Sequence, residues 1–428
     1  MNELMKSVLI LSSAPQTQKA INKAFEARGF TPIGLNINCR ENDKLPERPP
    51  SAILLKTQKF TEQLNKTIAL IKARYVGLNI PILVLTSSTQ VPEDLIFDSV
   101  LLEPCHPAQI VLRTIGLIRL AQMEQEIGLR LETLEHDFGI THTRPDMSTN
   151  EPFNILFVGK ASPEFMVIIN ALQRKNVRVV AAFTSFTAFD YLYEQTFDAV
   201  VMNGLMSLDS ALSVTQTMRK NAKLFHVPAL LMANDISKRN QDAVYDAGMN
   251  DILNIDDNLE DISTRVLEQA NFHRLHQNLK HEFGMLGGDV CTDTATQLYN
   301  KSFFNAHLSR VFKFYDMQDM PVSLCLIRIS PHDDNKTDEA IGASYQQIGV
   351  MIKNLVRLQD ITARLEPNLF AISFPGQTAG QLGPVIERIE SILKCATLSD
   401  PLTGAILKIK LELTMTTLNT AGATASVA

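Results

Sequence analysis

The sequence predicts an α/β protein made of two doubly wound domains followed by a third, mixed α/β domain. Short runs of Val, Ile and Leu occur at residues 7–13, 51–56 and 81–87, separated by stretches with the spacing of amphipathic helices. The same alternation returns at residues 154–159, 198–203 and 228–232. Continuous apolar runs that alternate with helices are typical of parallel strands covered on both faces. The repetition therefore predicts two similar units.

The region after residue 290 has a different pattern. Strands are expected at residues 321–330, 368–374 and 407–418, with helical stretches around 340–358 and 378–395. We place the three domains at residues 1–140, 152–283 and 290–428.

A long apolar stripe lies between the first two domains. In residues 112–138, apolar side chains recur at steps of three and four, which predicts one apolar helix face. The helix either packs on its own domain or serves as a dimerisation or interdomain helix. Both alternatives stay open, and the polar residues 141–152 are expected to form a linker.

Composition favours a folded protein of the cytoplasm. Of the 428 residues, 45% are hydrophobic and 20% are charged, which is ordinary for a globular protein. A chain of this length is too long for a single hydrophobic core. No run of about 18 apolar residues is present, so we expect no membrane insertion. The formal net charge of −6 gives no overall attraction to nucleic acid.

Cysteines and histidines give no sign of a metal site. The five cysteines lie far apart without a Cys-x-x-Cys spacing, so neither zinc nor a disulfide framework is expected. His273, His276 and His281 lack an acidic or cysteine partner set and are interpreted as packing or solvated residues.

The first two domains resemble the receiver domains of response regulators, which have a flavodoxin-like fold. In that family a strand-end Asp accepts a phosphoryl group, two acids hold Mg²⁺, and a Thr or Ser and a Lys complete the site. In the first domain these positions hold Lys56, the pair Ser12 and Ser13, Thr86, and Glu103 in place of the Lys. In the second they hold Asn203, Gly159 with Lys160, Ala233 and Ile255. Without the acids we expect neither a phosphoacceptor nor Mg²⁺ binding in either domain.

One exchange in the first domain suggests a structural replacement. The Asp and Lys of the family are exchanged for Lys56 and Glu103, so an attractive pair would persist with its charges reversed. A separation of about 4 Å or less is required, and at an exposed strand end such a pair contributes about 1 kcal/mol. The alternative is two unrelated surface charges.

The third region resembles the GGDEF domain, the nucleotidyl-cyclase-like fold of diguanylate cyclases. Residues 293–304, DTATQLYNKSFF, match the opening motif of that family, although Gln297 replaces its Gly. Arg357 and Asp360 stand at the spacing of the Arg-x-x-Asp motif that precedes the signature. The signature itself is replaced by Glu366, Pro367, Asn368 and Leu369, and Phe370 alone is kept.

The resemblance implies that catalysis is lost. The family draws its metal ligands from positions that are Arg328 and Asn368 here, and neither a cation nor an amide replaces a carboxylate as a Mg²⁺ ligand. The domain is also expected to be C-terminally shortened, without the closing helix of the family. We therefore expect no enzyme activity, no catalytic residue, no metal and no cofactor.

The retained motif implies a ligand, cyclic di-GMP. An arginine fork can donate to guanine or phosphate, and an Asp carboxylate can accept from guanine N–H groups. The inhibitory site of the family takes a further Arg from the next helix, here Arg388, and one from the second receiver, here Arg178. The alternative without a binding role for Arg357 and Asp360 is a surface salt bridge between residues three apart.

The whole chain thus resembles PleD/PopA-like response regulators, with two receivers and a GGDEF domain that are all degenerate. The leading hypothesis is a non-enzymatic cyclic di-GMP effector that recruits protein partners and forms a homodimer. The alternatives are a scaffold that dimerises without ligand and a residual diguanylate cyclase.

Overall fold

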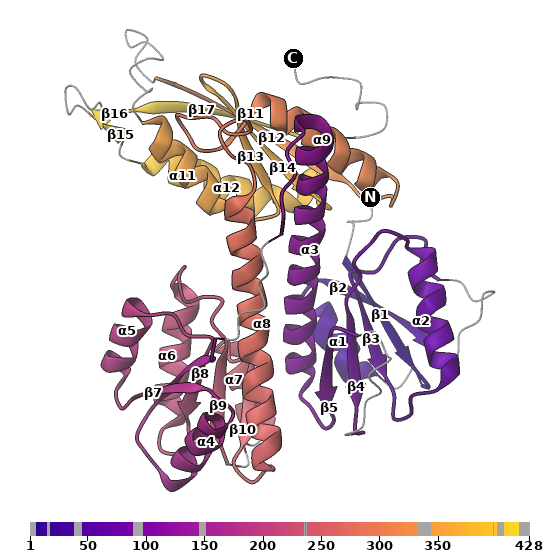
Figure 1. Ribbon diagram of the computed structural model, residues 1–428, viewed down its shortest axis with the longest axis vertical. Coiled ribbons are helices and arrows are strands. Elements are labelled where there is room, and N and C mark those ends of the chain that lie inside the picture. The colour runs from indigo at the N-terminus through magenta and orange to yellow at the C-terminus, as the bar shows by residue number, and fades with distance from the viewer. Residues whose placement is uncertain are drawn as a thin grey trace.

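The computed structural model shows two parallel α/β domains side by side, with a third domain above them (Figure 1). It describes residues 6–14, 18–37, 45–88, 97–144, 151–234, 236, 238–331, 344–396, 398–399 and 406–418. Cys39, residues 145–150 of the expected linker and the C-terminal tail lie outside these ranges.

The first domain has a five-stranded parallel sheet in the order β2-β1-β3-β4-β5, which is a doubly wound topology. Its strands are β1 (Lys6–Ser12), β2 (Phe30–Asn36), β3 (Ala52–Lys56), β4 (Ile82–Thr86) and β5 (Ser99–Leu102). Helix α1 (Lys19–Glu26) packs on one face through Phe25, and α2 (Glu62–Arg74) packs on the other through Ile68. The sheet is therefore covered on both sides, as the apolar runs predict.

The second domain repeats this topology, with the order β10-β9-β8-β6-β7. Its strands are β6 (Asn154–Val158), β7 (Arg178–Ala182), β8 (Ala199–Asn203), β9 (Ala229–Ala233) and β10 (Asp251–Asn254). The helices are α4 (Pro163–Arg174), α5 (Ser185–Glu194), α6 (Leu208–Lys220) and α7 (Lys238–Asp246). Separate apolar clusters fill the two faces of the sheet.

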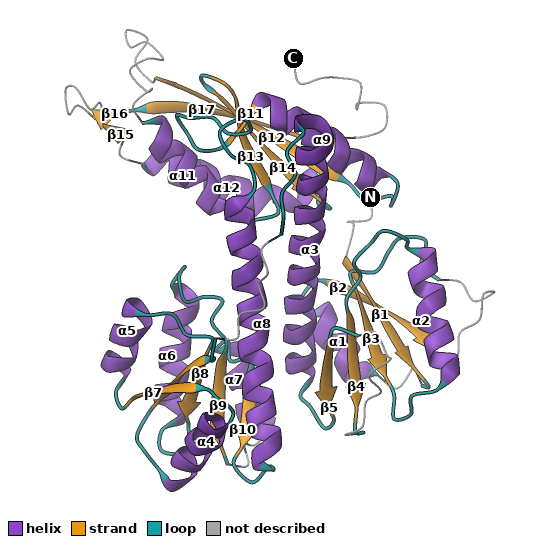
Figure 2. Ribbon diagram, in the orientation of Figure 1, coloured by secondary structure: helices purple, strands orange, loops and turns teal. Residues whose placement is uncertain are grey.

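The third domain has a mixed sheet in the order β11-β13-β14-β12-β17. Its strands are β11 (Tyr299–Asn300), β12 (Val322–Pro331), β13 (Ile361–Glu366), β14 (Leu369–Pro375) and β17 (Ile409–Leu418), with β15 (Leu398–Ser399) and β16 (Ile406–Leu407) as a separate pair. Helices α9 (Lys301–Asp316), α11 (Tyr345–Leu355), η2 (Ala379–Leu382) and α12 (Gly383–Cys395) complete it. The predicted α/β fold class is confirmed for all three sheets, and Figure 2 shows the alternation.

Two long helices connect the domains. Helix α3 (Pro107–Phe138) follows the first sheet, and α8 (Leu259–Met285) follows the second and leads to the third domain. They run side by side (Figure 1) and approach closely, because a Cβ at Gly116 of α3 would lie 2.8 Å from the ring of Phe272 on α8. The absence of a side chain at Gly116 thus permits the crossing.

The apolar stripe on α3 proves to have both expected roles. Ile110 and Leu117 pack into the core of the first domain. Further along, Met123 and Ile127 pack with Phe303 of α9 in the third domain. The second half of α3 is therefore an interdomain helix, while the expected dimerisation remains a prediction.

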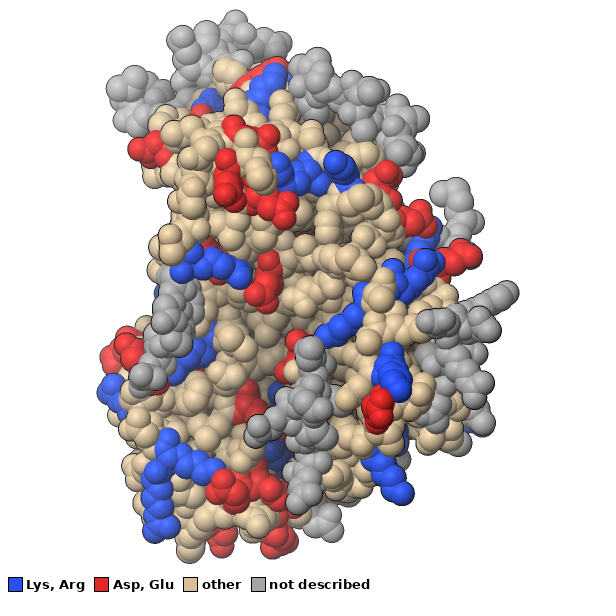
Figure 3. All heavy atoms as spheres, turned by 45° about the vertical axis from the view of Figure 1, so that its right-hand side comes forward, with Lys and Arg blue, Asp and Glu red and all other residues tan. Residues whose placement is uncertain are grey.

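Two surface observations complete the fold. No helix among the described residues is long and apolar enough to cross a membrane. On the face drawn in Figure 3, basic and acidic side chains are interspersed and do not gather into one basic stripe.

Candidate functional site

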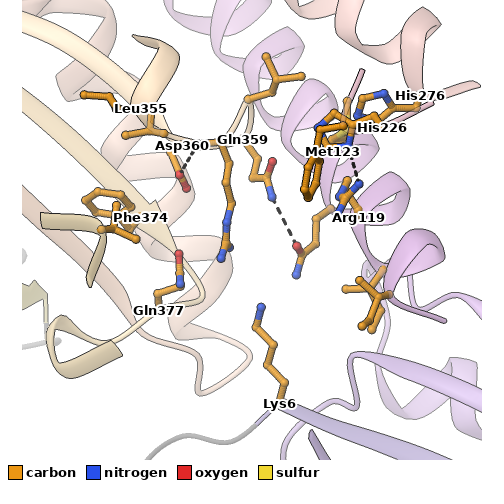
Figure 4. Close-up of a pocket in the computed structure, with 18 of the residues that line it drawn as sticks. Lys6, Arg119, Met123, His226, His276, Leu355, Gln359, Asp360, Phe374 and Gln377 are labelled. Atoms are coloured by element: carbon orange, nitrogen blue, oxygen red, sulfur yellow. Dashed lines mark hydrogen bonds between the residues drawn. The ribbon is translucent and has the colours of Figure 1, made fainter. Parts of the chain in front are cut away.

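A cavity of about 680 Å³ lies where the three domains meet (Figure 4). Leu355, Asp360 and Gln377 of the third domain face it from one side, and Arg119 of α3 faces it from the other. The volume is within the usual range for sites that enclose a small ligand. The cavity contains three of the four ligand residues expected from the sequence, Arg357, Asp360 and Arg388.

Arg357 and Asp360 lie in a turn, so the helical stretch expected up to residue 358 ends before them. Helix α11 ends at Leu355, and the backbone N–H of Asp360 donates to the carbonyl of Arg357 at 3.1 Å. In return, Oδ2 of Asp360 accepts from the backbone N–H of Arg357 at 2.9 Å. The carboxylate therefore closes the turn, and the surface salt bridge that was the alternative is not formed.

Asp360 has the character of a binding group. Its side chain is buried, and its Oδ1 has no hydrogen-bond partner among the described residues. Burial raises the pKa of Asp360 to about 6, against the opposing effect of Arg357. An unsatisfied buried carboxylate oxygen is costly, so it marks a place where a ligand donor would be stabilising.

The two other predicted arginines have different outcomes. Arg388 of α12 lines the cavity and donates through Nη2 to the carbonyl of Leu355 at 2.7 Å. Arg178 does not line it, because the residue is exposed at the start of β7, the outer strand of the second sheet. The convergence of Arg178 on this site is therefore not seen within one chain.

The first domain contributes two cations that sequence reasoning did not find. Lys6 at the start of β1 and Arg119 on α3 both line the cavity (Figure 4). Burial and the nearby Arg357 lower the pKa of Lys6, and the same two causes lower that of Arg119. No carboxylate of the described residues lies within salt-bridge distance of Lys6, Arg119 or Arg357.

The second domain supplies planar groups beside Arg119. Nη1 of Arg119 lies 2.9 Å from Nδ1 of His226, and the His226 and His276 rings are 4.7 Å apart. Burial and Arg119 lower the pKa of His226 to about 4, and burial with His226 lowers that of His276 to about 3. Both imidazoles are therefore neutral near pH 7, and Nδ1 of His226 accepts a hydrogen bond from Nη1 of Arg119. The interpretation of His276 as a packing residue agrees with its burial.

The charge of the cavity favours an anion. Lys6, Arg119, Arg357 and Arg388 carry four positive charges, Asp360 is the one acid among the lining residues, and the net charge is thus +3. Phe30, Phe225 and Phe374 add aromatic faces. Cations, aromatic rings and one carboxylate acceptor together match a phosphate-bearing purine ligand.

The strand ends of the first domain, where the resemblance places the phosphoacceptor Asp and the Lys, contain the exchanged ion pair. Nζ of Lys56 lies 2.7 Å from Oε1 of Glu103, with side-chain exposures of 29% and 21%. This distance satisfies the limit of about 4 Å, so the hypothesis of a charge-reversed pair is confirmed. Gln58 also donates to Glu103 at 2.9 Å. Two opposite charges that neutralise each other thus stand where the resemblance expects the Asp and the Lys.

In the second domain, Asn203 fills the corresponding site with its own hydrogen bonds. Its Nδ2 donates to the carbonyl of Lys160 at 2.7 Å, and its Oδ1 accepts from the N–H of Leu205 at 3.1 Å. Gly159 has φ of 125°, and a Cβ there would lie 2.8 Å from Cβ of Asn203. A side chain at position 159 therefore meets both backbone strain and a steric clash.

The hairpin of the third domain joins the two positions that the resemblance assigns to metal ligands. Nη1 of Arg328 on β12 donates to Oδ1 of Asn368 at 3.2 Å. Arg364 donates to the carbonyl of Pro367 at 2.9 Å and pairs with Asp293 at 3.2 Å. A cation and an amide thus stand at this strand end, where a metal ion would need carboxylates.

Comparison with known proteins links the chain to response regulators. It is 26% identical over 188 residues to the response regulator PleD of Caulobacter vibrioides strain NA1000 / CB15N, with 43% of this chain covered. PleD of a second strain gives the same values. The chain spans 38% of the length of these curated relatives in the match. No protein-family profile matches the chain.

Solved structures resemble single parts of the chain. A putative response regulator from Chloroflexus aurantiacus is 18% identical and covers 28% of this chain and 98% of its own, with a TM-score of 0.27. The GGDEF domain of FimX from Pseudomonas aeruginosa covers 29% of this chain and 79% of its own, at 18% identity and a TM-score of 0.27. The GGDEF domain of DgcB from Caulobacter crescentus, solved with c-di-GMP, covers 30% of this chain and 80% of its own, at 18% identity and a TM-score of 0.27.

Proposed function

We propose that the protein is a cyclic di-GMP effector that binds the dinucleotide in the cavity between its three domains and catalyses no reaction. The observation that carries the proposal is the convergence of Arg357, Asp360 and Arg388 on one cavity, with Oδ1 of Asp360 buried and unpaired. The similarity to the response regulator PleD supports a signalling role.

Each of these side chains has a role that follows from its chemistry. The Asp360 carboxylate accepts from the N–H groups of a guanine edge, and the Arg357 guanidinium donates to guanine O6 and N7 or to a phosphate. Arg388, whose guanidinium donates to the carbonyl of Leu355, adds a second positive charge that can contact a phosphate of the ligand. The ligand would then be bound by charge-assisted hydrogen bonds on a preorganised turn.

The absence of catalysis rests on the ligands that a diguanylate cyclase needs. Joining two GTP molecules requires metal ions that neutralise the triphosphates during in-line attack. Arg328 and Asn368 occupy the positions that the family uses for this purpose, and they bond to each other. The third domain is therefore proposed to read the dinucleotide without making it.

Ligand binding would act on this effector by fixing how its three domains are arranged. The cavity is lined by residues of all three domains, so a bound ligand would hold them in one arrangement that protein partners can recognise. Recruitment of partners and homodimer formation are part of the proposal.

Isothermal titration of the full chain with cyclic di-GMP tests the proposal. Wild type should bind in the micromolar range or tighter, Arg357→Ala should abolish binding, and Arg388→Ala should weaken it. Arg174→Ala is the matched control, since Arg174 is exposed and does not line the cavity. If wild type shows no binding at micromolar ligand, the scaffold alternative replaces this function.

A further inference from the structure

The wall of the cavity opposite the Arg-x-x-Asp turn has a composition of its own. It consists of Lys6 from β1, Arg119 from α3, and Phe225, His226 and His276 from the second domain and α8. Figure 4 shows Arg119, His226 and His276 together on the side away from Asp360 and Phe374. Neither the Arg-x-x-Asp resemblance nor any comparison assigns a function to this wall, which we call the α3 wall.

Arg119 is presented as a binding group. Its Nη1 is held 2.9 Å from the neutral Nδ1 of His226, which directs the guanidinium without neutralising it. No carboxylate among the described residues lies within salt-bridge distance of Arg119 or Lys6. Burial and the charge of Arg357 lower the pKa of both groups. Cations that repel each other in an enclosed space are stabilised by an anion, so a phosphate is the ligand group that suits this wall.

The aromatic residues beside Arg119 add a surface for a base. Phe225 is 46% exposed, and its ring centroid lies 5.0 Å from that of His226. Purine bases stack on such rings and on guanidinium planes. A phosphate group and a stacking face next to each other match one nucleotide unit.

A cyclic dinucleotide has two identical nucleotide halves, while the cavity has two different walls. We infer that the α3 wall is a second half-site, which holds one nucleotide of the ligand while Arg357, Asp360 and Arg388 hold the other. The inference rests on the proposed function. Its consequence is selectivity, because linking two half-sites through one ligand raises affinity by a factor on the order of 10² to 10⁴ over either half alone.

Titration of the full chain with two ligands, cyclic di-GMP and GMP, tests this inference. Wild type should bind cyclic di-GMP at least about a hundredfold more tightly than GMP. Arg119→Ala should weaken cyclic di-GMP binding by about tenfold or more, as expected when a charge-assisted contact is lost. Lys6→Ala should act in the same direction, and Arg119→Lys should retain part of the affinity. Arg74→Ala, an exposed arginine of the same domain, should bind like wild type.

The outcomes separate the two claims. If Arg357→Ala loses binding while Arg119→Ala and Lys6→Ala both bind cyclic di-GMP like wild type, the second half-site is wrong and the proposed function stands. If GMP binds as tightly as the dinucleotide, the second half-site is also wrong. If wild type binds neither ligand, the proposed function and this inference fall together. Circular dichroism of each variant, compared with wild type, shows that lost binding is not lost folding.

Discussion

Arg130 on α3 donates through Nη2 to the backbone carbonyl of Leu358, at 3.0 Å and across 228 positions of sequence. Leu358 lies inside the Arg357 to Asp360 turn, so the last helix of the first domain holds the candidate ligand turn of the third. Nε of Arg130 also donates to Glu126 at 2.7 Å, and Nε2 of His307 on α9 lies 3.0 Å from the same carboxylate oxygen. All three side chains are buried.

The buried network predicts a large effect on stability. Arg130→Met leaves the Glu126 carboxylate buried beside His307 without its cation, and we expect the free energy of unfolding to fall by about 3–5 kcal/mol. The double variant Glu126→Gln with Arg130→Met should recover most of this loss, because neither charge remains. Denaturant unfolding measures both, and Glu135→Gln, an exposed acid on the same helix, is the control. A loss below about 1 kcal/mol for Arg130→Met would contradict the prediction.

Asp360 predicts that ligand binding depends on pH. The carboxylate accepts guanine N–H groups only when ionised, and its pKa is raised to about 6 by burial. Affinity for cyclic di-GMP should therefore decrease as the pH falls from 7.5 through about 6 to 5. Titrations across this range test it, with Asp360→Asn expected to remove this pH dependence. An affinity of wild type that stays constant would rule out ionised Asp360 as the acceptor.

The raised pKa of Asp360 has the opposite effect on the stability of the free protein, which decreases as the pH rises. A carboxyl whose folded pKa is raised contributes stability that is fully present below its ordinary pKa of 3.8 and is lost as the pH rises through about 6. Asp360→Asn should therefore flatten the stability profile of the free protein between about pH 4 and 6. Thermal unfolding of both proteins across this range measures the difference, and parallel profiles would contradict it.

The ion pair between Lys56 and Glu103 predicts a modest coupling free energy that survives when the two charges are exchanged. At 2.7 Å and partly exposed, the pair should contribute about 0.2–1 kcal/mol to the stability of the first domain. Lys56→Glu should therefore destabilise the protein, and adding Glu103→Lys should restore an attractive pair. A double-mutant cycle in denaturant measures the coupling. Lys66 with Glu62, an exposed pair on α2, provides the comparison. No coupling between Lys56 and Glu103 would favour two unrelated charges.

The third domain predicts no cyclase activity. Incubation of the full chain with GTP and Mg²⁺ or Mn²⁺ should yield no cyclic di-GMP, because Arg328 and Asn368 provide no carboxylate for the metal ions. Chromatography of the nucleotides, with an active diguanylate cyclase as the positive control, gives the answer. If more cyclic di-GMP forms than in a control reaction that lacks the protein, the residual cyclase alternative is supported.

Apolar runs in the sequence identified the central strands of the two doubly wound sheets. Residues 51–56 and 198–203 correspond to β3 and β8, whose residues are covered on both faces and are therefore almost wholly apolar. The edge strands β2 and β7 did not stand out, since they are only partly buried and contain polar residues or Pro32. Continuous hydrophobicity reports burial on both faces, and an edge strand lacks it.

The sequence by itself determined the local chemistry of this protein. The residues Lys56, Asn203 and Asn368, which stand where the resemblance expects acids, and the spacing of Arg357 and Asp360 can be read from short stretches of the chain. Only the tertiary structure decided which distant residues share the cavity, since it brought Arg119 to the site and left Arg178 outside it. The physical reason is that this convergence depends on how α3 packs against α8 and α9, a contact between surfaces that no local spacing encodes.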